Sequence, residues 1–88
     1  MSQVSPHVIS LEEGVLRVLY EEPASALECA ARLLGHGYAA EVVTDEVETL
    51  LAGLALRACV RPAGDGTSPR YALTAAGSER LASLVEAA

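Results

Sequence analysis

The sequence contains no lysine, phenylalanine or tryptophan, and its 88 residues include only two cysteines and three tyrosines. All six basic side chains are arginines, set against twelve acidic side chains, so the net charge is −6. This overall charge opposes contact with a polyanion, and a nucleic-acid interface would need a local cluster of arginines. No apolar run approaches the ~18 residues of a membrane span, and residues 1–10 lack the pattern of a signal peptide. We therefore expect a cytoplasmic protein with no membrane partner.

The residues used in metal sites are few and badly spaced. Cys29 and Cys59 are far apart in the chain and lie in apolar surroundings, which is typical of buried, reduced thiols. His7 and His36 have no cysteine or acid at ligand spacing. We expect no metal and no cofactor.

Catalytic patterns are missing as well. No serine has a histidine and an acid at motif spacing, and no phosphate-binding glycine loop is present. The acidic pairs Glu12–Glu13 and Glu21–Glu22 are expected on or beside exposed helix surface, where a general acid–base role is unfavourable. The sequence therefore predicts a protein that is not an enzyme.

Helix signals divide the first two thirds of the chain. Ser10 and Ser25 each stand three residues before a glutamate, which predicts two capping boxes and helices that end near residues 21 and 35. In the second helix we expect the buried stripe to be Leu27, Ala30, Ala31 and Leu34. Thr44 is expected to cap a third helix; Val42 and Val43 either lengthen it backward or form a short extended piece. The stripe expected to be buried in this helix is Val47, Leu50, Leu51, Leu54 and Ala58.

A hairpin and a last helix are expected after residue 57. Residues 58–61 and 70–73 form two short apolar segments, and residues 62–69 between them are rich in turn formers. Thr74 is expected to cap the last helix, and Tyr38 to anchor a loop in the core. We expect an N-terminal arm over residues 1–9 and one domain over residues 10–88.

Two passages resemble the winged helix-turn-helix superfamily. Residues 51–61, LAGLALRACVR, resemble the pattern L-x-x-L-x-x-x-G-L-V-x-R that leads from the recognition helix into the wing, with Ala58 in place of the usual glycine. Residues 70–77, RYALTAAG, resemble the pattern R-Y-x-L-T-x-x-G that leaves the wing. The resemblance implies a mostly helical α+β fold: a three-helix core, a two-stranded wing and a C-terminal helix.

Proteins of this superfamily have different roles, so the fold leaves the function open. Repressors of the MarR, PadR and ArsR types bind DNA, whereas the corresponding domain of small-molecule O-methyltransferases binds a second subunit. Winged-helix domains that recognise leader peptides have the fold too.

The charge distribution favours a protein partner over DNA. The would-be recognition helix opens with Asp45, Glu46 and Glu48, and carboxylates are poor partners for phosphates. These three residues and Thr49 are therefore candidates for partner binding, and Ile9, Leu84 and Val85 for the seam of a homodimer.

The alternative is a small transcriptional regulator. Residues 57–88 carry four arginines and three acids, against two arginines and nine acids in residues 1–56. Arg57, Arg61 and Arg70 lie beside or within the expected wing, where winged-helix repressors place minor-groove arginines. These three residues are the candidates for DNA binding.

Overall fold

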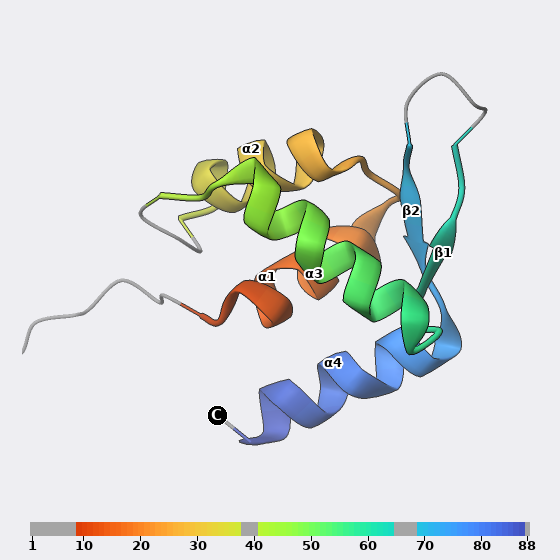
Figure 1. The fold of residues 1–88 in the computed structure, drawn as a ribbon. Coiled ribbons are helices and arrows are strands. Elements are labelled where there is room, and N and C mark those ends of the chain that lie inside the picture. Colours follow the sequence, from red (N-terminus) through yellow and green to blue (C-terminus); the bar gives the residue numbers. More distant parts are fainter. Residues whose placement is uncertain (1–8, 38–40, 65–68, 88) are drawn as a thin grey trace, which may run out of the picture.

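The computed structural model describes residues 9–37, 41–64 and 69–87. Four helices and a hairpin follow one another in the expected order: α1 (Leu11–Glu21), α2 (Ala26–Gly35), α3 (Thr44–Leu56), β1 (Val60–Pro62), β2 (Tyr71–Leu73) and α4 (Ala75–Ala87). Figure 1 shows α1 in the middle, with α2 and α3 on one side, α4 on the other and the hairpin at one end. The expected mostly helical α+β architecture is confirmed.

Local hydrogen bonds explain where α1 and α2 begin. The Ser10 hydroxyl accepts the Glu13 N–H at 3.1 Å, and the Ser25 hydroxyl accepts the Glu28 N–H at the same distance. In α2 the Glu28 carboxylate also accepts the Ser25 N–H at 2.9 Å, so this capping box is complete. In α1 only half of the box forms, because the Glu13 carboxylate instead pairs with Arg17 at 2.7 Å.

The start of α3 differs from the expectation. Val43 occupies the N-cap position in an extended conformation, and Thr44 is the first helical residue, without a capping hydrogen bond from a side chain. The alternative in which Val42 and Val43 lengthen the helix backward is therefore wrong, because the helix begins after both residues. The expected loop anchor Tyr38 lies outside the described residues.

The buried face of α2 shares only Ala30 with the one expected. Leu27 is 69% exposed and Leu34 46% exposed, and Ala31 is exposed as well. The side chains that α2 buries are Ala26, Cys29, Ala30 and Leu33, a stripe with the same helical spacing. The choice between the stripes is made by α1: Leu33 occupies the space where a side chain at Gly14 would stand.

The hydrophobic core lies among α1, α2, α3 and the base of the hairpin. Its largest fully buried side chains are Val15, Leu16, Cys29, Leu33, Val47, Leu51 and Leu54. Leu50 packs against this core while partly buried, and Ala58 lies beyond the end of α3 and is exposed. Of the stripe expected in the third helix, Val47, Leu51 and Leu54 are therefore confirmed as buried.

The strands pair antiparallel, with Arg61 opposite Ala72. Tyr71 also forms a bridge to Ala24 in the segment between α1 and α2, through backbone hydrogen bonds of 2.9 and 3.1 Å. The base of the wing is thus tied to the helix-turn-helix.

One threonine joins the end of α3 to the start of α4. The Thr74 hydroxyl donates to the Ala58 carbonyl at 2.6 Å and accepts the Gly77 N–H at 3.0 Å, so the expected cap is confirmed. Ala58 has a φ of +62°, the left-handed conformation that usually requires glycine, so the turn has the conformation that the resembled pattern implies. A side chain at Gly77 would collide with the Cys59 backbone carbonyl, which explains the glycine.

Candidate functional site

The first turns of α3 present an exposed acidic surface. Asp45, Glu46, Glu48 and Thr49 are all exposed, as a partner-binding surface requires. Asp45, Glu46 and Thr49 line a shallow pocket of about 380 Å³ with Leu50, whereas Glu48 belongs to a different pocket. The structure thus divides the four candidate residues between two surfaces.

The wing carries two of the three candidate arginines. Arg61 lies exposed on β1, and no ion pair links it to another described residue. Arg70 directly precedes β2, and its Nη2 lies 3.2 Å from Oε2 of Glu28. The Ser25 N–H lowers the pKa of Glu28, and the charges of Arg70 and Arg32 lower it further. Because Glu28 serves α2 as its cap, one carboxylate both starts that helix and holds a wing arginine.

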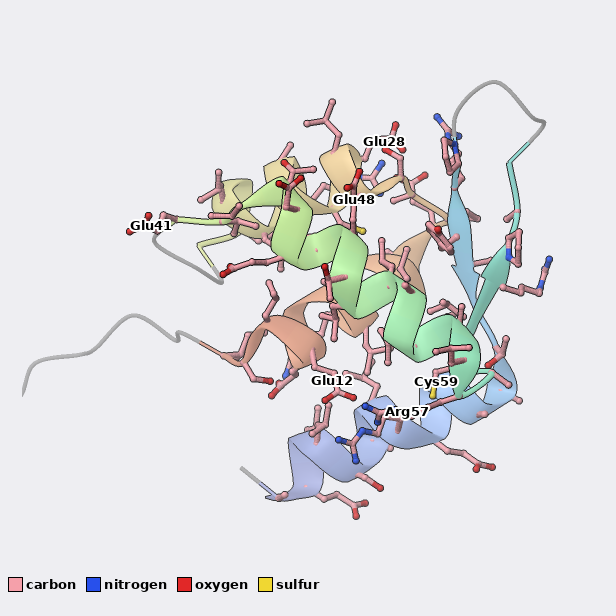
Figure 2. The ribbon with its side chains drawn as sticks, in the orientation of Figure 1. Glu12, Glu28, Glu41, Glu48, Arg57 and Cys59 are labelled. Atoms are coloured by element: carbon pink, nitrogen blue, oxygen red, sulfur yellow. The ribbon has the colours of Figure 1, made fainter. Side chains whose placement is uncertain are left out.

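Arg57 lies in another part of the molecule. It follows α3, and its Nη1 lies 4.0 Å from Oε2 of Glu12 on α1. Figure 2 shows Arg57 and Glu12 at the α4 side of the molecule, away from Glu28 and Glu48. The structure therefore does not bring Arg57 together with Arg70.

Glu12 is the centre of a charged cluster with Arg57 and Arg80, which the sequence did not predict. Its Oε2 lies 2.7 Å from Nε of Arg80 on α4, and its Oε1 lies 3.1 Å from Nη2 of the same side chain. The hydrogen bond from Arg80 lowers the pKa of Glu12, and the charges of Arg80 and Arg57 add to this effect. The expectation that Glu12 and Glu13 lie on exposed helix surface is wrong, since Glu12 is half-buried and Glu13 is buried. For Glu12 the reason is that α4 packs across α1, which no local pattern encodes.

A pocket of about 330 Å³ lies where α2, α3 and the wing meet. Its lining comes from Ser25, Ala26, Leu27, Thr44, Glu48, Pro69 and Tyr71. The sequence pattern did not indicate this site, because the helical spacing in α2 predicted Leu27 in the core. The one local signal for it was the position of Tyr71 in the motif that leaves the wing.

The three residues expected at a homodimer seam have different surroundings. Ile9 approaches α1 beside Gly14, and Leu84 packs partly buried against the core. Val85 is 44% exposed. Of the three, Val85 thus offers the most free apolar surface.

The two cysteines are buried and reduced, as expected. Burial raises the pKa of Cys29 to about 11, which makes its thiol unreactive at neutral pH. Within residues 9–37, 41–64 and 69–87, no three potential ligands are grouped as a metal site requires. None of the helices in these ranges is long and apolar enough to cross a membrane.

Known proteins give a consistent structural likeness. No protein-family model matches the chain, and no curated protein matches it. Among solved structures, RosR from H. salinarum has a TM-score of 0.72 at 24% identity, over 88% of this chain and 70% of that chain. The transcriptional regulator BldR from Sulfolobus solfataricus has a TM-score of 0.71 at 22% identity, over 89% of this chain and 54% of that one.

A third similar structure contains DNA. PadR from Bacillus subtilis, solved in complex with operator DNA, has a TM-score of 0.68 at 19% identity, over 85% of this chain and 46% of that chain. The likeness is to transcriptional regulators rather than to enzymes, and at these identities it concerns the fold. The chain therefore has the winged helix-turn-helix fold.

Proposed function

We propose that this protein is a transcriptional regulator that contacts duplex DNA with α3 and the wing. The observation that carries the proposal is the wing itself, where Arg61 and Arg70 are exposed next to the helix-turn-helix of α2 and α3. Operator-bound PadR has the same fold. This reverses the preference for a protein partner that the charge distribution suggested.

The acidic start of α3 limits how such a complex forms. Asp45, Glu46 and Glu48 repel phosphates, so the wing must supply the favourable phosphate or minor-groove contacts. Arg70 is available for this role, because its pair with Glu28 is half exposed, with side chains 49% and 36% accessible. Exposed pairs contribute little, and a phosphate can therefore replace the carboxylate. Carboxylates on α3 can still accept a hydrogen bond from a cytosine amino group.

The test is duplex-DNA binding measured by fluorescence anisotropy at several salt concentrations. We expect binding that weakens with salt, and a shallower salt dependence in the double variant Arg61→Ala/Arg70→Ala, by about one unit of slope per lost phosphate contact. Arg32→Ala is the control for each of the two single variants, since it also removes one positive charge, but from α2, where Arg32 pairs with Glu22 at 3.0 Å. Absence of any binding at about 50 mM salt would contradict the proposal.

Self-association through α4 is a second candidate function, and it is compatible with the first. The only residue that α4 buries fully is Gly77, and Val85 remains 44% exposed at the far end of the helix. Dimeric helix-turn-helix proteins bind two half-sites, so a seam at Ile9, Leu84 and Val85 would fit a regulator.

Sedimentation at increasing protein concentration tests this second candidate. We expect dimer formation that Val85→Glu abolishes. Ala75→Glu is the control, because it adds the same charge at an exposed position in the first turn of α4. A monomer at all concentrations would contradict self-association.

A further inference from the structure

The pocket between the wing and the helix-turn-helix has the properties of a ligand site. Its volume of about 330 Å³ lies at the lower end of the range of small-molecule pockets. One wall, at Tyr71, is fixed by the paired backbone hydrogen bonds to Ala24, and another by the complete capping box of Ser25 and Glu28. The pocket is thus formed by backbone that its own hydrogen bonds hold in place.

The charges around the pocket favour a cation. Among the described residues of the lining, Glu48 is the one with a charged side chain, and no ion pair joins it to another residue of the described ranges. Figure 2 shows Glu28 and Glu48 on the same side of the molecule, and Arg70 already balances Glu28. The capping box of Ser25 and Glu28 already binds backbone N–H groups at the positive end of α2.

The partial positive charge at the start of α3 does not make the pocket favour an anion. Its first turn carries Asp45 and Glu46, whose carboxylates compensate the partial charge of a helix start. Glu48 thus remains as an uncompensated negative charge in the wall.

The remaining lining suits an apolar body attached to that cation. Leu27 is 69% exposed on the surface of α2, and Ala26 and Pro69 add apolar contact. Tyr71 provides an aromatic ring, which offers further apolar contact area. The Ser25 and Thr44 hydroxyls are polar groups that can fix the orientation of a ligand.

We propose that this pocket binds a small organic amine, with its ammonium group at Glu48 and its apolar body against Leu27 and Tyr71. The binding site stands independently of DNA recognition. If the proposed function holds, the ligand would occupy the space between α3 and the wing and would compete with DNA for that surface.

A titration followed by amide NMR tests the site with benzylamine as the probe. Benzyl alcohol and benzoate are the neutral and anionic counterparts of similar size. We expect saturable binding of benzylamine that is tighter than that of either counterpart, with shifts at Ala26, Glu48 and Tyr71. Glu48→Gln should weaken this binding about tenfold, as loss of a hydrogen bond to a charged group does.

Glu46→Gln is the matched control, because it removes the same charge from the first turn of α3 but lies outside this pocket. Both positions are exposed, so neither variant should affect folding. Equal weakening by the two variants, or equal affinity for benzylamine and benzyl alcohol, would show attraction to the general charge or apolar surface and would overturn the proposal. So would a preference for benzoate, or no saturation up to about 10 mM.

Competition with duplex DNA separates this inference from the proposed function. We expect benzylamine to release DNA from the protein at a concentration about tenfold lower than from Glu48→Gln. If the protein binds no DNA, the proposed function fails while the titration still decides the ligand site. If the protein binds both together without competition, the inferred overlap with the DNA surface is wrong.

Discussion

Ala58→Gly should stabilise the protein, although glycine usually destabilises a folded chain. Ala58 ends α3 with a φ of +62°, and its carbonyl accepts the Thr74 hydroxyl at 2.6 Å, so the rest of the structure holds it there. A left-handed conformation costs an L-residue about 1–2 kcal/mol. The additional freedom of glycine in the unfolded chain offsets about 0.5–1 kcal/mol of that gain.

The net expectation is a stabilisation of about 0.5–1 kcal/mol. In a domain of this size it corresponds to a rise of about 2–8 °C in Tm. The Ala58 side chain is exposed, so removing its methyl group sacrifices little packing.

Ala55→Gly is the matched control for this prediction. Ala55 is also exposed, but it has a helical conformation in the last turn of α3, where glycine costs up to about 0.5–1 kcal/mol relative to alanine. Urea denaturation of the two variants and the parent protein measures both effects. If Ala58→Gly lowers stability as Ala55→Gly does, the reasoning from the left-handed conformation is refuted.

Three further predictions concern the helices and their ionisable groups. Gly77→Ala should destabilise the protein by about 1–3 kcal/mol through overpacking, whereas Gly53→Ala, with open space around it, should stabilise it by about 0.5–1 kcal/mol; thermal denaturation that shows the same sign for both would contradict this. Arg80 lowers the pKa of Glu12 below its usual 4.5, so the stabilisation by this carboxylate is present above that pH and is lost as the pH falls through the folded-state pKa. Glu12→Gln should therefore destabilise at neutral pH and converge with the parent protein in acid, whereas parallel stability curves from about pH 3 to pH 7 would exclude the effect. Burial raises the pKa of Cys29 from 9.0 to about 11, so stability should fall as the pH rises between these values, and a thiol reagent should modify Cys29 far more slowly in the folded protein than in denaturant.

The sequence by itself determined the order of the elements and most of their ends. Ser10, Ser25 and Thr74 each use a hydroxyl that accepts a backbone N–H three residues later, so the information for these helix starts is contained in four consecutive residues. Gly77 stands in the local motif that leaves the wing, although its physical reason, the nearby Cys59 carbonyl, is a tertiary contact.

Tertiary packing alone decided which surfaces these elements present. In α2 two apolar stripes have equal helical spacing, and the space beside Gly14 selects the one with Leu33, leaving Leu27 to line a pocket. Glu12 finds Arg80 at a separation of 68 positions, a contact that no local periodicity encodes. Hydrogen bonds within a turn are fixed by neighbouring residues, whereas burial and charge pairing depend on how whole helices meet.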